Sequence, residues 1–563
     1  MTNWDHTTDV IVVGSGGGGM TAALVAAQAG LETLLIEKTE FYGGTTALSG
    51  GGLWVPNNHL LQQDGLDDSP AKARTYLQHT VGDRTPQALQ EAYLRLAPEM
   101  VRYLVDNSHM RFHRSVGYAD YYPERPGGMA DGRAIEASPF DGSKLGADLR
   151  QLRPMSIEIP AGLAFTASEY NKLGMLTSTW TGKKTALKVG ARTLFNMLTG
   201  VKLLALGQAL IARLRLSLKE ENVPLWLNTS LQELVMAEGA VVGIVAKREG
   251  KPVRIRANRG VVLAAGGFAH NQQMREQYQQ GPINHEWSSA GPGDTGEAIR
   301  LGMQAGAGID LMDDAWWGPA SLPPDAPVMF HVGERSYPGG IMVNAAGRRF
   351  TNEAASYVEV VHAMYAQHSA ETPHIPAFFI MDQRFRNKYI FGILFPMQPI
   401  PKNYLESGYL KRADTVAELA QRCGIDAQNL TATIERFNQF ARRGVDGDFH
   451  RGDSAYDRYY GDPTVRPNPC LAPIAKPPFY AVQIVPGDLG TKGGPVTDEH
   501  ARVLRPDGSA IQGLYAVGNN AASVMGNTYP GAGSTIGPAM AFGYSAARHL
   551  AHGKIRSSGQ HPP

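Results

Sequence analysis

The segment Asn527-Thr-Tyr-Pro-Gly-Ala-Gly-Ser-Thr-Ile-Gly537 places one phenol four residues before a glycine, in a turn that leads into a helix. The Tyr529 hydroxyl and the Gly533 amide could both donate to one oxygen atom, and glycine lets the backbone approach that atom closely. Pro538 suits the first turn of the helix, because proline fixes φ and its missing donor is not needed there. The positive end of the helix favours developing negative charge. The segment is either an oxygen clamp or a structural loop that caps a helix.

The other end of the chain has the pattern of a dinucleotide site. Asp9–Val13 predicts a buried parallel strand, and the cluster Gly14–Gly19 that follows it fits GxGxxG. The small residues of Met20–Ala29 predict a helix whose first amides would cradle a pyrophosphate. Thr33–Ile36 predicts the second strand, and Glu37 stands where a carboxylate accepts hydrogen bonds from a ribose diol. The register of these features favours a dinucleotide site over a chance glycine loop.

Downstream segments favour FAD over NAD. Tyr42–Trp54 adds a second cluster of glycines and hydroxyls directly after the acid, where a flavin needs close backbone approach. Arg259–Gly267 and Gly513–Asn519 predict further buried strands that end in small residues. Distant parts of the chain would therefore meet on one FAD. The residues predicted to bind it are Gly14, Gly16, Gly17, Gly18, Gly19, Met20, Glu37, Lys38, Gly43, Gly44, Thr45, Thr46, Ser49, Gly50, Gly51, Gly52, Leu53, Leu231, Ala264, Ala265, Gly266, Gly267, Asn271, Asp294, Gly518, Asn519, Ser534, Thr535 and Ile536.

Size and composition limit the remaining possibilities. A chain of 563 residues exceeds one ordinary core, so two or more domains are expected. The net charge of +1 gives no global reason to bind nucleic acid. Cys423 and Cys470 form no CxxC pair or disulfide framework, which suits a reducing cytosol, and we predict no metal site. No apolar stretch reaches the ~18 residues of a membrane span. We expect a cytoplasmic protein.

The predicted fold class is α/β: a Rossmann-like FAD-binding domain of the glutathione reductase type, with an inserted α+β catalytic or cap domain. The first part of the FAD-binding domain is expected at 1–317, the cap at 318–489 and the second part at 490–563. Residues 183–215 mix lysines and arginines with leucines. They predict a basic amphipathic helix that lies either on the inner face of a membrane or on the protein itself.

The chain resembles the FAD-dependent 3-ketosteroid delta-1-dehydrogenases, within the wider group of fumarate reductase-like flavoproteins. The likeness covers nearly the whole chain, and its specific part is the Tyr529/Gly533 spacing together with Tyr357. The segments that carry it are Gly14–Met20, Gly43–Pro56, Asp120–Glu124, Asn352–Tyr357, Gly490–Gly494 and Tyr529–Gly537.

The resemblance implies 1,2-desaturation of 3-ketosteroids, with a quinone or another electron acceptor as second partner. Tyr529 and Gly533 would polarise the C3 carbonyl and stabilise the enolate charge. Tyr357 would take the C2 proton while FAD takes hydride from C1. An unperturbed phenol has a pKa near ~10, so a second phenol that donates a hydrogen bond would help the base. The resemblance suggests Tyr121 as this second phenol, with Tyr118 and Tyr122 as alternatives.

Other functions stay open from the sequence. Fumarate-type reduction needs cations for a dicarboxylate, and Arg348, Arg349 and Lys492 keep this alternative. A phenol and amide clamp suits a ketone better than two carboxylates. Ketosteroid dehydrogenases that desaturate the 4,5 bond are closer alternatives. A flavin-bearing electron-transfer or steroid-binding protein without turnover is the third, and the candidate base Tyr357 argues against it.

Overall fold

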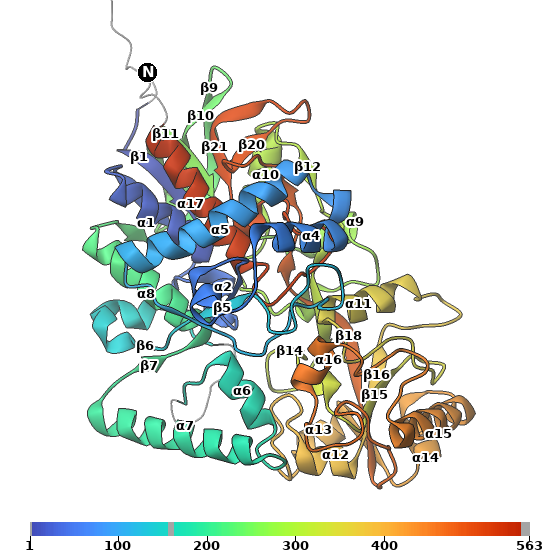
Figure 1. Ribbon diagram of the computed structural model, residues 1–563. Helices are drawn as coiled ribbons and strands as arrows, with labels where there is room; N and C mark the ends of the chain where they lie inside the picture. Colours follow the sequence, from blue (N-terminus) through green and yellow to red (C-terminus); the bar gives the residue numbers. More distant parts are fainter. Residues whose placement is uncertain (1–2, 156–162, 553–563) are drawn as a thin grey trace, which may run out of the picture.

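The computed structural model describes residues 3–155 and 163–552, and a large mixed sheet forms the core of the upper part in Figure 1. Its strands follow the order β20 (Arg502–Leu504), β21 (Ala510–Ala516), β11 (Lys251–Leu263), β1 (His6–Val13), β2 (Thr33–Ile36) and β8 (Leu225–Trp226), with β10 (Ala240–Arg248) and β9 (Thr229–Ala237) extending from β11. Strand β1 pairs in parallel with β2 and β11. The predicted parallel strands and the α/β fold class are therefore confirmed.

The sheet is buried on both faces, which explains its apolar strands. Val10 and Val12 of β1 join the main hydrophobic core, whereas Ile11 and Val13 join a second cluster with Ile244 of β10. The helices of this part are α1 (Gly17–Gln28), α2 (Gly44–Leu48), α3 (His59–Gln63), α4 (Pro70–Thr80), α5 (Gln87–Asn107), α8 (Leu206–Glu220), α9 (Gln272–Tyr278), α10 (Glu297–Gln304) and α17 (Ile536–His552). Helices α1 and α17 cross so closely that a Cβ at Gly18 would lie 2.7 Å from the Ala539 carbonyl oxygen. The glycine cluster thus packs a helix as well as opening a site.

The second sheet occupies the lower right of Figure 1. Its order is β14 (Met329–Phe330), β13 (Ala315–Ser321), β18 (Phe479–Thr491), β16 (Ala377–Asp382) and β15 (Gly340–Val343), with β17 (Leu410–Ala413) beside β18. Its helices are α11 (Tyr357–Ala366), α12 (Gln383–Lys388), α13 (Lys402–Glu406), α14 (Val416–Cys423), α15 (Ala427–Arg443) and α16 (Ala455–Tyr460). The predicted boundaries at 317/318 and 489/490 fall inside β13 and β18, which pair with each other. We infer that the cap domain begins and ends at this strand pair.

Smaller elements complete the described chain. Strands β3 (Gly52–Trp54), β5 (Ala134–Ala137) and β4 (Phe112–Arg114) form a sheet, β6 (Phe140–Asp141) pairs with β7 (Leu203–Leu204), and β12 (Ile309–Asp310) pairs with β19 (Gly494–Pro495). Helices α6 (Ala167–Gly174) and α7 (Trp180–Thr199) lie at the lower left of Figure 1, and Asn171 of α6 donates to the Tyr459 carbonyl oxygen at 3.0 Å.

The prediction of one helix over 183–215 is wrong. Gly200 ends α7 in the left-handed conformation, with φ 74°, and α8 begins only at Leu206. Helix α8 is packed on the protein, with Leu210 and Ile211 fully buried. The alternative of a helix packed on the protein therefore applies to α8, and membrane contact stays a prediction for α7 alone.

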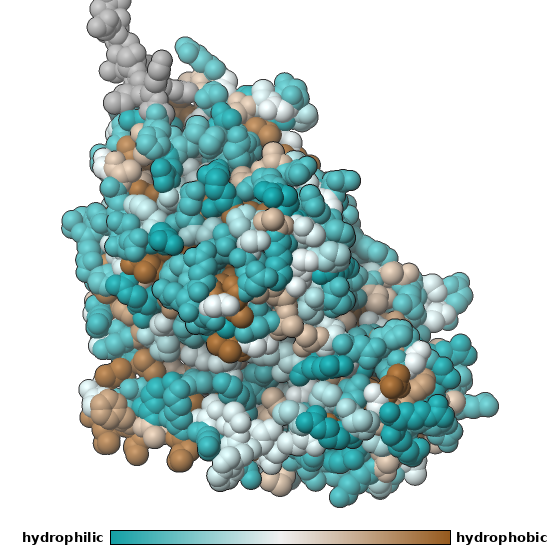
Figure 2. Space-filling view, in the orientation of Figure 1, coloured by the Kyte–Doolittle hydropathy of each residue, from teal (hydrophilic) through white to brown (hydrophobic). Residues whose placement is uncertain are grey.

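Helix α7 exposes its more apolar face. Thr185 and Thr193 are buried, whereas Leu187 and Leu198 are 76% and 79% exposed. Trp180, Leu194, Phe195 and Met197 are also exposed, and Figure 2 shows an apolar patch at the position of α7. None of the helices in the described residues is long and apolar enough to cross a membrane.

Candidate active site

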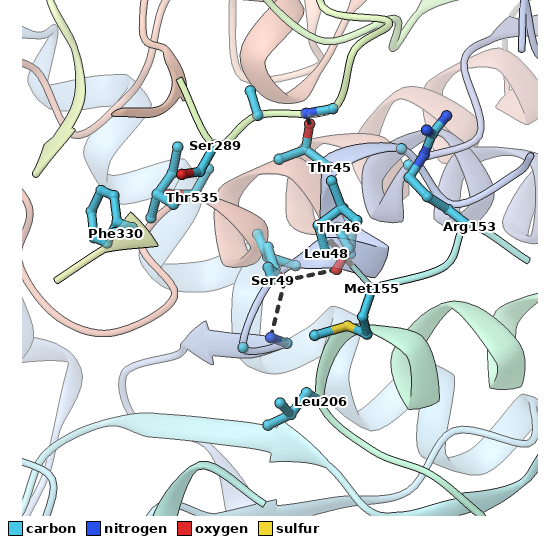
Figure 3. Close-up of a pocket in the computed structure, with 18 of the residues that line it drawn as sticks. Thr45, Thr46, Leu48, Ser49, Arg153, Met155, Leu206, Ser289, Phe330 and Thr535 are labelled. Atoms are coloured by element: carbon cyan, nitrogen blue, oxygen red, sulfur yellow. Dashed lines mark hydrogen bonds between the residues drawn. The ribbon is translucent and has the colours of Figure 1, made fainter. Parts of the chain in front are cut away.

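One cavity of about 1690 Å³ connects the glycine cluster at α1 with the tyrosines beside the cap domain. Figure 3 shows part of its wall, where Thr45, Thr46 and Leu48 come from α2, Leu206 from the start of α8 and Phe330 from β14. The cavity exceeds the usual ~300–1,000 Å³ of a small-molecule pocket. It is large enough for a dinucleotide and a second organic molecule.

The end of the cavity at α1 is shaped to receive a pyrophosphate. Gly16 precedes α1, whose first turn carries no acidic residue, and the Gly17 amide donates to Thr46 Oγ1 at 3.1 Å. Beside Gly16 an added Cβ would meet only Thr46 Oγ1, at 3.6 Å, so the backbone is open to the cavity. The amides and the positive dipole end at a helix N-terminus favour a phosphate. These residues therefore fit the diphosphate of FAD.

Glu37 stands at the tip of β2, as predicted, and its carboxylate is held from both sides. Ser15 donates to Oε2 from its amide and its hydroxyl, at 3.2 and 2.6 Å. Thr39 donates to Oε1 from its amide and its hydroxyl, at 3.0 and 2.9 Å. These bonds orient the carboxylate at the cavity wall, where it can accept hydrogen bonds from ribose hydroxyls.

Most of the predicted cofactor residues line the cavity, and a minority do not. Those in the wall are Gly14, Gly16, Gly17, Gly18, Gly19, Glu37, Lys38, Gly44, Thr45, Thr46, Ser49, Gly50, Gly51, Gly52, Leu231, Ala264, Ala265, Gly266, Asp294, Gly518, Asn519, Thr535 and Ile536. Those outside it are Met20, Gly43, Leu53, Gly267, Asn271 and Ser534. Met20 and Leu53 are fully buried in the core, and Asn271 caps α9. Ser534 bonds the Gly531 carbonyl. The residues outside the wall therefore support the site through packing and turns.

Several residues of the wall are absent from the set predicted from the sequence. Ser289, Ala290 and Gly291 line the cavity, and the Gly291 amide donates to Thr45 Oγ1 at 2.8 Å. His270 and Arg153 are also in the wall. The small residues of Ser288–Gly293, directly before Asp294, were a signal that could have revealed the first three.

Asp294 is a buried carboxylate of the wall. Burial raises its pKa to about 7, although a hydrogen bond from Thr45 and the charge of Lys38 oppose the rise. The Thr45 hydroxyl donates to Asp294 Oδ2 at 3.2 Å. Such a group exchanges a proton near neutral pH and accepts hydrogen bonds from hydroxyl groups when ionised.

At the other end of the cavity, Tyr529 and Gly533 lie in the turn before α17. Gly533 has φ +95°, and an added Cβ would collide with the backbone of Gly52, so only glycine fits. Burial raises the pKa of Tyr529, while hydrogen bonds with Thr535, Tyr357 and the Gly533 amide oppose this rise. Both residues therefore lie in the cavity wall at this turn, and their joint action on one oxygen stays a prediction.

Tyr357 is the first residue of α11 and faces the same point. Its ring lies 5.3 Å from that of Tyr529, edge to face. The Tyr121 hydroxyl donates to the Tyr357 hydroxyl at 3.0 Å, and Tyr118 lies 3.3 Å from Tyr121. Tyr460, which the sequence analysis missed, donates to Tyr118 at 2.6 Å. Four phenols therefore form one hydrogen-bonded chain that ends at Tyr357.

The geometry separates the three candidate partners of Tyr357. Tyr121 contacts it directly, and Tyr118 is one step further along the chain. Tyr122 instead donates to Glu359 at 2.7 Å. Burial raises the pKa of Tyr357 well above its usual value, and the hydrogen bond from Tyr121 opposes this rise.

The cations considered for a dicarboxylate are engaged elsewhere or exposed. Lys492 is buried and bonds Asp314 at 2.9 Å. Arg349 bonds Glu353 and Asp446, at 2.7 and 2.8 Å. Arg348 is exposed, and none of the three belongs to the described cavity wall.

A dinucleotide cradle that shares one cavity with convergent phenols defines a flavoprotein of the FAD-binding type. The family of the FAD binding domain matches residues 9–536. The chain is 49% identical over 552 residues to 3-oxosteroid 1-dehydrogenase of Mycobacterium tuberculosis, covering 96% of this chain and 98% of the relative. It is 35% identical over 563 residues to 4-oxocyclohexanecarboxylate 2-dehydrogenase of Sinomonas cyclohexanicum, covering 97% and 93%.

A solved structure agrees with these relatives. The 3-ketosteroid delta1-dehydrogenase from Sterolibacterium denitrificans, in complex with 1,4-androstadiene-3,17-dione, superposes with a TM-score of 0.92 and 43% identity, over 97% of this chain and 99% of that chain. The chain therefore belongs to the 3-oxosteroid 1-dehydrogenase family of FAD-dependent oxidoreductases. The predictions of the family and of FAD are confirmed, while the roles of single site residues stay predictions.

The raised pKa of Asp294 predicts a pH-dependent stability of the FAD-free protein. Between about 4, the ordinary pKa of aspartate, and about 7, the native state binds more protons than the unfolded state. Stability from this group is therefore lost as pH rises through that range. We expect Asp294→Asn to reduce the fall in melting temperature between pH 5 and pH 8. Asp67→Asn, at a side chain that is 99% exposed, is the matched control. An unchanged pH dependence in Asp294→Asn would contradict the raised pKa.

Proposed function

We propose that the protein desaturates the C1–C2 bond of 3-ketosteroids. The observation that carries this proposal is the meeting of Tyr529, Gly533 and Tyr357 at one end of the cavity. Two donors near one point suit a ketone oxygen, and a third phenol beside them suits the neighbouring C–H bond.

Tyr529 and Gly533 act on one atom of the steroid, and Tyr357 acts on another. Tyr529 Oη and the Gly533 amide donate to the C3 oxygen and stabilise the negative charge that grows there when C2 loses its proton. Tyr357 Oη accepts that proton. When bound, FAD supplies the acceptor of the hydride from C1. The charge on the C3 oxygen collapses back to a carbonyl as the C1–C2 double bond forms, so the clamp acts on the proton-transfer half of the reaction.

Three features help Tyr357 to act as a base despite its burial. Tyr121 donates to its oxygen and stabilises the phenolate. Tyr357 begins α11, and the positive end of a helix dipole favours an anion there. Tyr460 donates to Tyr118 and Tyr118 is bonded to Tyr121, so the chain polarises the bond that Tyr121 donates to Tyr357.

The cavity wall favours a steroid over a carboxylated cyclohexanone, the compound class in the name of the Sinomonas relative. Apart from the residues near the dinucleotide end, the described wall is mostly apolar and includes Leu173, Leu176 and Val189. Its lysine and arginine are Lys38 and Arg153, and Arg153 bonds Thr39 beside Glu37. A carboxylate near the tyrosines would lack a cationic partner, which is unfavourable in an apolar wall.

The first test is the product from 5α-androstane-3,17-dione. We expect the holoprotein to bleach its flavin on anaerobic mixing and to yield the 1-ene, identified by mass spectrometry and NMR. A 4-ene product would indicate the 4,5-desaturating alternative. Binding without bleaching would support a steroid-binding protein, and reoxidation of the reduced protein by fumarate, without steroid turnover, would overturn the proposal.

The second test is the pH dependence of turnover. Because the base must be ionised and its pKa is raised, we expect kcat to rise about tenfold per pH unit below that pKa. Tyr357→Phe should lower kcat by about 10²- to 10⁴-fold. Tyr121→Phe removes the hydrogen bond that opposes the raised pKa, so its profile should move to higher pH. Tyr122→Phe is the control, because Tyr122 bonds Glu359 instead. A Tyr121→Phe profile that coincides with the wild-type profile would contradict this role.

We also infer that α7 rests on an anionic lipid surface, which would supply lipophilic steroids and a quinone acceptor. Its exposed face carries Leu187, Leu194 and Leu198, with Lys183 and Lys184 exposed beside them. The opposite side of the helix, including Ala186 and Val189, lines the cavity. Apolar contact with lipid and lysine contact with anionic headgroups reinforce each other.

This surface predicts a loss of vesicle binding in the triple variant Leu187→Ser, Leu194→Ser, Leu198→Ser. Burial of one leucine contributes about 1.5–3 kcal/mol, so we expect a loss of at least about 100-fold in affinity. The measurement is cosedimentation with vesicles of phosphatidylglycerol and phosphatidylcholine. Val445→Ser, at a residue that is 59% exposed on the cap domain, is the control. Equal binding by the triple variant and the wild type would contradict lipid contact through α7.

A further inference from the structure

Thr535 directly precedes α17, and its hydroxyl has an unusual partner. A threonine at this position ordinarily caps the helix by accepting a hydrogen bond from the amide two or three residues later. Here the residue three positions later is Pro538, which has no N–H. The amide of Gly537 is already bonded to the Gly533 carbonyl oxygen at 2.9 Å. The Thr535 hydroxyl is thus released from capping, and it lies 3.0 Å from the Tyr529 hydroxyl.

The Tyr529 side chain is otherwise fixed. Its ring packs against Trp316, Tyr121 and Tyr357, with centroids 5.0, 5.1 and 5.3 Å away. Only the direction of its hydroxyl proton is free to change. A phenol has one proton, so a Tyr529 that donates to Thr535 cannot donate to a ketone. The direction of this one hydrogen bond therefore decides whether the clamp works.

The surroundings favour Thr535 as the donor once a ketone is present. Within residues 3–155 and 163–552, the hydrogen bond to Tyr529 is the one found for the Thr535 hydroxyl. Threonine is β-branched, which limits its χ1 and keeps the hydroxyl in place. When Tyr529 donates to a ketone, its oxygen can accept from Thr535, and the two bonds polarise each other in one direction.

We propose that Thr535 is a positioning residue of the oxygen clamp: its hydroxyl donates to Tyr529 and so directs the Tyr529 proton to the C3 oxygen of the steroid. This inference rests on the proposed function and adds a residue to its clamp. The contribution grows with the negative charge on the steroid oxygen, so it acts on the transition state more than on substrate binding.

The test compares Thr535→Val, which keeps the shape and removes the hydroxyl, with Thr535→Ser, which keeps the hydroxyl. We expect Thr535→Val to lower kcat about tenfold, less than the ~10²–10³ lost with a direct oxyanion donor, and to change KM little. Thr535→Ser should recover kcat to within about threefold of wild type. Thr528→Val is the matched control, because the Thr528 hydroxyl lies in the same loop and bonds the Met525 carbonyl at 3.0 Å. Melting temperature should match wild type in all variants, and kcat is expressed per bound flavin because Thr535 also lies in the wall predicted to bind the cofactor.

Isotope effects distinguish a role at the clamp from a role at the flavin. In Thr535→Val, removal of the C2 proton becomes slower, so the isotope effect with a C2-deuterated steroid should increase and that with a C1-deuterated steroid should not. Three results would each overturn the inference while leaving the desaturation in place. They are an isotope effect that increases at C1 alone, a kcat of Thr535→Val equal to that of wild type, and a kcat of Thr535→Ser that does not recover. Absence of desaturation by the wild type would overturn the proposed function and this inference together. If Thr535→Val does not fold, Thr535→Ala makes the same comparison.

Discussion

The carbonyl oxygen of Pro530 is the point where the segments of the active site are joined. It accepts hydrogen bonds from the Tyr76 hydroxyl at 2.6 Å and from the Tyr121 amide at 2.9 Å. The Tyr76 hydroxyl also accepts from the Tyr122 amide at 3.2 Å. One buried phenol thus ties the loop of Tyr529 to the segment of Tyr121, and loss of a buried partner costs about 1–3 kcal/mol. The spacing between Tyr529 and Tyr121, which donates to Tyr357, depends on this junction.

Pairs of oppositely charged, buried side chains hold the segments that carry Tyr121 and Tyr357. Asp120, next to Tyr121, bonds Arg133 and accepts from Trp54 Nε1 at 2.8 Å. On the side of the cap domain, Glu353 bonds Arg349 and Arg451, at 2.7 and 3.1 Å, shortly before Tyr357. Removal of one partner from such a buried pair costs about 3–5 kcal/mol. The tyrosines are therefore aimed by rigid ionic frames that belong to separate parts of the chain.

The local pattern of the sequence was enough to place the strand, glycines and helix of the nucleotide end and the turn that carries Tyr529 and Gly533, because the residues of each are close in sequence. The position of each of these groups is set by a single turn of the chain. The groups are Gly14–Gly19, Glu37 and the pair Tyr529 and Gly533. Contacts that arise only from tertiary packing could not be predicted from local sequence pattern. Tyr460 reaches Tyr118 only because α16 folds back against the FAD-binding part, and no spacing in the sequence records this. Met20 and Gly43 fit the motif and yet serve the packing of helices.

Helix α7 separates the cavity from the outer surface of the protein. Ala186, Val189 and Gly190 border the cavity, while Leu187 and Leu194 point away from it. One residue inserted before Ala186 would turn the rest of the helix by about 100° and bring other side chains to the cavity. A single substitution on α7 can thus alter either the cavity wall or the outer surface alone, whereas a change in helix length alters both at once.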